Sequence, residues 1–323
     1  MVLEVNCKLS EKYLIFLLIL ASTALLTMMP NQAYALSSQS SSGPRSSFKR
    51  VALITGSNKG IGKEIARKIG KEDDQTICLL GCRDEELGRA AVRELIDDGC
   101  PNVAFVHVDL SDISTIRQAA KTIEEEYGQC DILVNNAAVC FNDPTLYGKV
   151  SHTPFVQQAD LTVRTNFFGT LSLTQSLLPL LRKSSSPRII NIASSAGRLA
   201  ILPSQQRRDD FTSENLTLEQ LDGYMEEFIR DVQDGTHQSK GWPNTCYGAS
   251  KVAIIAMTKI MARSESNIMV NSVDPGYCAT DQNNNQGYVP AERGATTPFL
   301  LATLPDDQFF TAVHWYEEQA IQW

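Results

Sequence analysis

Short apolar runs alternate with amphipathic segments along most of this 323-residue chain. The runs lack the regular polar alternation of half-exposed strands and are typical of strands buried on both faces of a parallel sheet. The amphipathic segments repeat their apolar residues at helical spacing. The expected strands are 51–54, 76–81, 103–108, 131–138, 188–195 and 268–273, and the expected helices are 63–71, 85–98, 113–127, 247–262 and 290–302. This order predicts an α/β fold: a doubly wound, Rossmann-like parallel sheet with helices on both faces.

Three stretches do not follow this alternation. Residues 151–182 form a long segment with an apolar stripe, and it contains Asn166, a poor helix former. Residues 203–241 are charged and mixed, with one expected helix at 218–232. We interpret them as an insertion within a single domain at 49–323. Residues 312–323 are too short and too mixed to assign.

The first 48 residues differ from the rest of the chain and are left out of the fold prediction. Lys8 and Lys12 precede an uncharged apolar run at 13–29, and Ala33-Tyr34-Ala35 follows. This pattern indicates a secretory signal peptide at 1–35, with an uncleaved membrane anchor as the alternative. Residues 36–48 are serine-rich and free of acids, as in a transit peptide or a flexible linker. We therefore expect entry into the endomembrane system, with onward import into a plastid and a membrane-anchored form as alternatives.

Composition narrows the class of partner. The net charge of −8 and the lack of a basic stripe argue against a nucleic-acid partner. One of the eight cysteines, Cys7, lies in the leader, which leaves an odd number for the rest of the chain. None of them shows C-x-x-C or metal-ligand spacing. Most lie in apolar runs, so we expect small buried thiols and no metal site.

Glycine or polar residues end the first four expected strands: Gly56, Arg83, Asp109 and Asn135. Ligands of such sheets bind outside the carboxyl ends of the strands, where the strand order reverses. The turn that begins at Gly56 also contains Gly60 and Gly62, and it leads into a helix whose N-terminus suits a phosphate. Its G-x-x-x-G-x-G spacing is not the common G-x-G-x-x-G. The glycine or polar residues at four strand ends are therefore stronger evidence for a nucleotide site than the glycine turn alone.

Two cations indicate which nucleotide binds. A 2′-hydroxyl is usually bound by an acid after the second strand, whereas a 2′-phosphate requires a cation. Here that strand is followed by Arg83, and Lys59 lies in the glycine turn. We interpret Asp84 as the N-cap of the next helix. The pattern favours NADPH as the cofactor. The alternative is that both cations are solvated surface residues without a role in binding.

Several motifs resemble, in this order, those of the classical short-chain dehydrogenases/reductases: Thr55-Gly-x-x-x-Gly60-x-Gly62, Asn135-Asn-Ala137, Asn166, Asn191-x-x-Ser194, Tyr247-x-x-x-Lys251, Pro275-Gly276 and Thr280. The resemblance covers residues 50–323. Finer features are similar to the carbonyl reductase subgroup: Thr165-Asn-Phe-Phe-Gly169, Gly241-Trp-Pro243 and the terminal Glu-Gln-Ala-Ile-Gln-Trp. The resemblance implies reduction of a small-molecule carbonyl (a ketone, aldehyde or quinone) by NADPH.

The resemblance also implies catalytic roles for Asn166, Ser194, Tyr247 and Lys251. Tyr247 would protonate the carbonyl oxygen, and Ser194 would donate a hydrogen bond to it, with Ser195 as the alternative. Residues four apart on a helix share one face, so Lys251 is expected beside Tyr247, where its charge favours the phenolate. Asn166 would hold a water that connects Lys251 to solvent.

The cofactor residues that the strand ends and the resemblance imply are Gly56, Asn58, Lys59, Gly60, Ile61, Gly62, Arg83, Asp109, Leu110, Asn135, Ala137, Pro275, Gly276 and Thr280. Asp109 would meet the adenine edge and Asn135 the ribose region. The chain departs from the family pattern at Ala138, Asp274 and Tyr277. Asp274 stands where an apolar or thiol residue is usual, so we expect a more polar substrate mouth.

Two further expectations concern assembly and an alternative function. The expected insertion helix has an apolar stripe that must be buried, formed by Leu218, Leu221, Met225, Phe228 and Ile229. The nearest surface that could bury it is the one that a partner subunit would otherwise cover. We therefore expect a monomer, with Trp242 near the rim of the substrate cleft. A redox sensor that binds NADPH without turnover is the alternative function, and a membrane-tethered scaffold is a weaker one.

Overall fold

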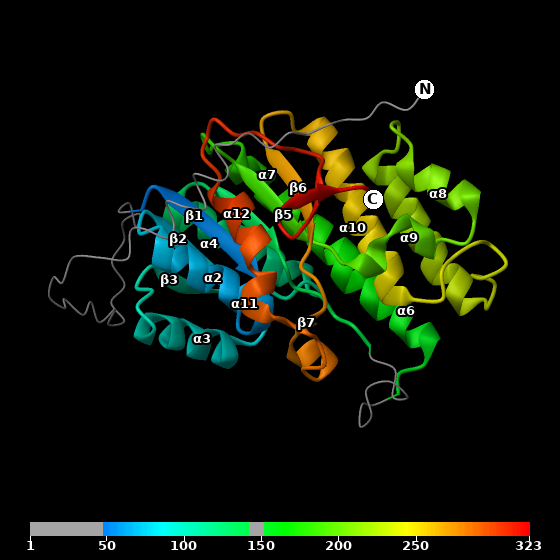
Figure 1. Ribbon diagram of the computed structural model, residues 1–323, viewed down its shortest axis with the longest axis horizontal. Coiled ribbons are helices and arrows are strands. Elements are labelled where there is room, and N and C mark those ends of the chain that lie inside the picture. The colour runs from blue at the N-terminus through cyan, green and yellow to red at the C-terminus, as the bar shows by residue number, and fades with distance from the viewer. Residues whose placement is uncertain (1–47, 142–151) are drawn as a thin grey trace, which may run out of the picture. The chain divides into compact units, whose positions relative to one another are not determined.

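Eight strands form one sheet in the order β10-β9-β6-β5-β4-β1-β2-β3 (Figure 1). The computed structural model describes residues 48–141 and 152–323. Neighbouring strands are parallel except β10, which is antiparallel to β9. The strands are β1 (Arg50–Thr55), β2 (Thr76–Cys82), β3 (Val103–His107), β4 (Ile132–Asn135), β5 (Arg188–Ile192), β6 (Met269–Asp274), β9 (His314–Tyr316) and β10 (Gln319–Ile321). The order reverses between β1 and β4, which confirms the doubly wound sheet and locates its switch point.

Strand β1 shows why the apolar runs are continuous. Val51 and Leu53 face one buried cluster, and Ala52 and Ile54 face another on the opposite side of the sheet. Helices cover both clusters: α4 (Ile113–Tyr127), α7 (Thr170–Leu181) and α10 (Cys246–Ser264) on the first side, and α2 (Gly60–Glu72), α3 (Glu85–Asp97) and α12 (Thr296–Thr303) on the second. In Figure 1, α2 lies beside α12. Because successive side chains of a strand point to opposite faces, both sets of positions must be apolar.

The segment at 151–182 is helical but not uniform. It contains α6 (Phe155–Val163), a π-helical turn η1 (Arg164–Gly169) and then α7. Gly169 lies so close to the β3–α4 connection that an added Cβ would be 2.1 Å from the Leu110 oxygen. The bulge and the glycine together allow this close approach, and the bulge displaces Asn166 from a regular helical position.

The insertion contains two helices, α8 (Gln205–Thr212) and α9 (Leu218–Gln233), rather than the single expected one. Helix α9 packs on α6 and α10 (Figure 1). Leu221, Met225, Phe228 and Ile229 are buried there, as expected. Phe211 is the one buried residue of α8, so its sequence carries no apolar periodicity from which a helix could be predicted.

Trp242 is not at a cleft rim, and that expectation is wrong. Its side chain is fully buried in the insertion, edge-on to Phe211 and Phe228. The Arg207 guanidinium lies 3.9 Å from the ring centroid. The indole Nε1 donates to Asp231, 2.9 Å away. An aromatic ring with a hydrogen-bonded nitrogen is suited to such a core, and the partners come from both insertion helices.

The carboxyl-terminal part differs most from expectation. The helix expected at 290–302 is divided into α11 (Ala291–Gly294) and α12, and 312–323 contributes β9 and β10 to the sheet. A small parallel pair, β7 (Cys278–Ala279) and β8 (Val289–Pro290), flanks the 3₁₀ turn η4 (Asp281–Asn283). Two further 3₁₀ turns follow β5: η2 (Ser195–Gly197) and η3 (Leu199–Ile201). Strands of two or three residues show no detectable periodicity.

The described elements belong to one unit of the chain, from Gly43 to Trp323. The predicted leader at 1–35, and 36–48 apart from Phe48, lie outside the described residues. Across 48–141 and 152–323, none of the helices has both the length and the apolar character needed to cross a bilayer.

Candidate active site

Helix α10 brings Tyr247 and Lys251 together, as the spacing predicts. The hydroxyl of Thr245 caps the helix by accepting a hydrogen bond from the Gly248 amide at 3.1 Å. The Lys251 Nζ lies 5.4 Å from the centroid of the Tyr247 ring. The lysine is buried and donates to the main-chain oxygen of Ile192 at 2.7 Å. The pair is therefore fixed against the end of β5.

Burial sets the protonation of both groups. It raises the pKa of the Tyr247 phenol, while interactions with the side chains of Gln282 and Ser194 act in the opposite direction. Burial also lowers the pKa of Lys251 to about 8. Desolvation therefore outweighs the expected lowering of the phenol pKa by Lys251. Tyr247 is thus the neutral phenol near neutral pH.

The loop after β5 separates the two candidate serines. The side chain of Ser194 acts to lower the pKa of the Tyr247 phenol, and it accepts a hydrogen bond from the Ala196 amide at 3.1 Å. The Ser195 backbone instead hydrogen-bonds to the Asp274 carboxylate. The interaction with the phenol therefore favours Ser194.

Asp274 does not make a polar substrate mouth, so that expectation is wrong. Its side chain is buried and accepts hydrogen bonds from the backbone of Gly276, at 3.0 Å, and of Ser195. Burial raises the pKa of this carboxyl. The residue therefore joins the end of β6 to the loop that carries Ser194.

The side chain of Asn166 joins two segments of the protein through hydrogen bonds. Its side-chain oxygen accepts from the Val139 amide at 2.8 Å, and its nitrogen donates to the Val139 oxygen at 2.9 Å. The same nitrogen lies 3.1 Å from the hydroxyl of Ser250 on α10. The side-chain amide of Asn166 is therefore hydrogen-bonded within the protein at both its oxygen and its nitrogen. It connects the loop after β4 with the helix that carries Tyr247.

The glycine turn is shaped by contacts that only glycine permits. Gly56 and Gly60 have φ angles of +65° and +56°. A Cβ on Gly62 would lie 2.5 Å from the side-chain nitrogen of Asn136. Asn136, absent from our predicted site, donates to the oxygens of Thr55 and Gly56. The paired asparagines after β4 were the signal, but the sequence does not tell which one reaches the turn.

The Asn135 side chain makes its hydrogen bonds within the protein. It is buried, and its side-chain nitrogen donates to Thr174 at 3.0 Å and to Asn191 at 2.8 Å. It therefore connects β4 with α7 and β5. Asp109 is half-buried at the end of β3, where it accepts from both the amide and the hydroxyl of Ser111.

The cations expected to hold the 2′-phosphate are both exposed. Arg83 follows β2, and within the described parts of the chain its guanidinium has no ion pair. Asp84 does cap α3, by accepting from the Leu87 amide at 2.9 Å. The Lys59 ammonium lies 2.9 Å from Asp281. With the nearest acid used as a cap and Cys82 buried, the residues present fit a 2′-phosphate better than a 2′-hydroxyl.

The remaining predicted cofactor residues surround this turn. Asn58 and Ile61 are half-buried within it, and Ala137 donates its amide to the Thr55 hydroxyl at 3.0 Å. After β6, Pro275 and Gly276 form a turn in which Gly276 has a φ of +81°. The Thr280 methyl group would be 3.4 Å from a Cβ on Gly60. The structure thus brings the turn after β1 and the turn after β6 together.

The thiols are mainly buried. Cys78, Cys82, Cys100, Cys130, Cys246 and Cys278 are buried, and Cys140 is half-buried. Cys140 is close enough to influence the electrostatics of both Tyr247 and Lys251. In residues 48–141 and 152–323, no group of three or more His, Cys, Asp or Glu side chains could hold a metal ion.

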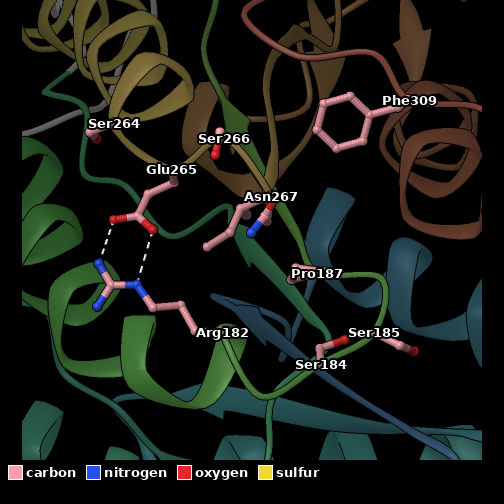
Figure 2. A pocket seen from close by; sticks show the side chains of 10 residues that line it. Arg182, Ser184, Ser185, Pro187, Ser264, Glu265, Ser266, Asn267 and Phe309 are labelled. Carbon is pink, nitrogen blue, oxygen red and sulfur yellow. Dashed lines mark hydrogen bonds and ion pairs between the residues drawn. The ribbon is translucent and has the colours of Figure 1, made fainter.

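A depression of about 620 Å³ lies away from these residues, beside the amino ends of β5 and β6 (Figure 2). Serines and an Arg182–Glu265 ion pair of 2.6 Å line it, together with Phe309. Catalytic sites of parallel sheets lie at the opposite, carboxyl edge. The depression is therefore not the active site.

A glycine turn and a Tyr–Lys pair at one edge of a doubly wound sheet define a dinucleotide-dependent oxidoreductase. The chain belongs to the short chain dehydrogenase family, whose model matches residues 50–204 and 235–288. The unmatched segment between them holds α8 and α9. The insertion is thus an addition to the family fold.

The relatives are reductases. Carbonyl reductase (NADPH) 1 of Bos taurus is 35% identical over 291 residues, which are 86% of this chain and 100% of that protein. The Mus musculus protein of the same name is 37% identical over 274 residues, 81% of this chain and 94% of that protein. Salutaridine reductase from Papaver somniferum has 30% identity and a TM-score of 0.75, over 83% of this chain and 99% of that structure. The resemblance to carbonyl reductases is thereby confirmed.

Proposed function

We propose that this protein reduces a ketone, aldehyde or quinone to the alcohol with NADPH. One observation carries the proposal: a buried lysine holds a tyrosine beside Ser194, at the sheet edge where the glycine turn and Arg83 are found. The carbonyl reductases to which the chain is similar are named for NADPH. The two exposed cations support the same cofactor.

Tyr247, Ser194 and Lys251 have different roles in the reduction of the carbonyl group. Bound NADPH supplies a hydride to the carbonyl carbon. Tyr247, a neutral phenol near neutral pH, donates its proton to the oxygen. Ser194 donates a hydrogen bond to the same oxygen and stabilises the charge that develops on it. The Lys251 ammonium lies over the ring and stabilises the phenolate that remains.

The test is NADPH oxidation by purified protein with a panel of ketones, aldehydes and quinones. We expect turnover with at least one class, followed as loss of NADPH absorbance and as alcohol formed. NADPH binding without turnover across the whole panel would contradict the proposal and favour the redox sensor.

We further propose that the leader directs the protein into the endomembrane system, with a plastid as a second destination. The apolar run at 13–29, Ala33-Tyr34-Ala35 and the acid-free serine-rich stretch support this. Amino-terminal sequencing of protein from the native cell is the test. Intact residues 1–35 on protein from the soluble cytosol would contradict it.

A further inference from the structure

Residues 278–290, which we term the strap, form a loop held together by its own contacts. Asn283 donates to the Cys278 oxygen at 2.8 Å, and it forms a reciprocal cap with Thr280. Gly287 lies so close to the other arm that an added Cβ would be 2.2 Å from the Cys278 backbone. These contacts fix the shape of η4 at the tip of the strap.

The strap reaches the glycine turn at two points. The Thr280 side chain lies against Gly60, and Asp281 forms its 2.9 Å ion pair with Lys59. The two charged side chains are 60% and 63% exposed. An exposed pair contributes only about 0–1 kcal/mol, so a stronger anionic ligand for Lys59 displaces Asp281 easily.

The next residue of the strap reaches the chemistry. The Gln282 side chain acts to lower the pKa of the Tyr247 phenol, against the larger effect of burial. The same 3₁₀ turn thus pairs Asp281 with a cation of the cofactor site and carries a side chain that influences the proton donor.

We propose that Asp281 is a cofactor-specificity residue: its carboxylate competes with the 2′-phosphate of NADPH for the Lys59 ammonium. A phosphate monoester carries a charge of about −1.5 to −2 and three acceptor oxygens, so it binds an ammonium more strongly than one carboxylate does. NADH lacks this phosphate and leaves the Lys59–Asp281 pair in place. The inference rests on the proposed function, because it assumes that NADPH is the cofactor.

The experiment measures equilibrium binding of NADPH and of NADH, by cofactor fluorescence, to the wild type and to Asp281→Asn. We expect Asp281→Asn to bind NADPH about two- to fivefold more tightly, the range that an exposed ion pair supports, and to leave NADH binding unchanged. The matched control is Asp307→Asn, which removes the same charge from an exposed acid after α12 and should change neither affinity. In Lys59→Met, Asp281→Asn should have no further effect.

Two results would overturn this assignment. Equal loss of affinity for both cofactors in Asp281→Asn would show that Asp281 only stabilises the structure of the site. Unchanged affinity for both cofactors would show that Asp281 does not compete for Lys59. The binding readout separates the inference from the proposed function. Tight NADPH binding with no turnover of any carbonyl contradicts only the reductase, whereas a wild type that binds no NADPH overturns both.

Discussion

The Lys251 ammonium donates a 2.7 Å hydrogen bond to the main-chain oxygen of Ile192, two residues before Ser194. This contact joins helix α10, which carries Tyr247, to strand β5, which delivers Ser194. The lysine therefore aligns the two groups that would meet one carbonyl oxygen, in addition to placing its charge over the ring. A buried ammonium that is held by a carbonyl also keeps its position without a carboxylate partner.

Tyr247→Phe should reduce turnover by about 10²- to 10⁴-fold, because the general acid is lost while the ring is kept. NADPH binding should remain near the wild-type value, since the hydroxyl is not expected to contact the phosphates. Steady-state kinetics and cofactor fluorescence measure the two quantities. Tyr224→Phe, in the insertion, is the matched control and should be neutral; turnover near normal in Tyr247→Phe would remove this residue from the mechanism.

Arg83→Asp should weaken NADPH roughly tenfold or more and change NADH binding little, because an acid replaces the exposed cation at the end of β2. Titration of each cofactor gives both dissociation constants. The control, Arg117→Asp, reverses an exposed charge on α4 and should leave both unchanged. Equal affinity of the wild type for NADPH and NADH would count decisively against this cofactor assignment.

His314 should make the fold sensitive to acid. Burial lowers the pKa of this imidazole, which lies 2.9 Å from the Ser272 hydroxyl, to about 4 from an ordinary value of 6.5. Between pH 4 and 6.5 this histidine is protonated in the unfolded chain but not in the folded protein, so acid favours unfolding. The contribution of His314 to stability is therefore complete above pH 6.5 and is lost as the pH falls to 4. The full loss is about 3 kcal/mol.

Urea unfolding at several pH values tests this for the wild type and His314→Gln. The variant should show a smaller fall in unfolding free energy between pH 6.5 and 4. His152→Gln replaces an exposed histidine and should retain the wild-type pH dependence. Identical slopes in all three proteins would show that His314 does not contribute.

Trp242→Ala should cost about 3–5 kcal/mol of unfolding free energy, because it leaves a large cavity and removes a donor from the fully buried Asp231. Denaturant titration measures the loss. Phe309→Ala, at an exposed ring, should cost little. A similar small cost at Trp242 would mean that the insertion core is not packed as described.

We expect protein without the leader to be a monomer, because α9 buries its apolar stripe on α6 and α10 and removes that surface from a partner. Light scattering at micromolar concentration is the measurement. Deletion of 204–240 should expose apolar surface and cause association. A stable dimer of the undeleted protein, or soluble monomers after the deletion, would contradict this.

The sequence alone determined the features that depend on local repetition. The run 51–54 within β1 is apolar at every position because both faces are covered, so the pattern itself indicates a central parallel strand. Tyr247 and Lys251 share a face because they are four apart on one helix. Glycines at 56 and 60 allow the positive φ angles of this turn, which other residues rarely adopt.

Only the tertiary structure decided which side chains serve the site and which serve the scaffold. Asn135 and Asn136 are adjacent, yet one joins β4 to β5 and the other holds the glycine turn. Trp242 is buried because Arg207 and Phe228, both distant in sequence, converge on it. The Lys59–Asp281 contact joins residues more than 200 positions apart. Such contacts arise when the chain closes around its core, and a periodic pattern holds no information about a partner that lies on another element.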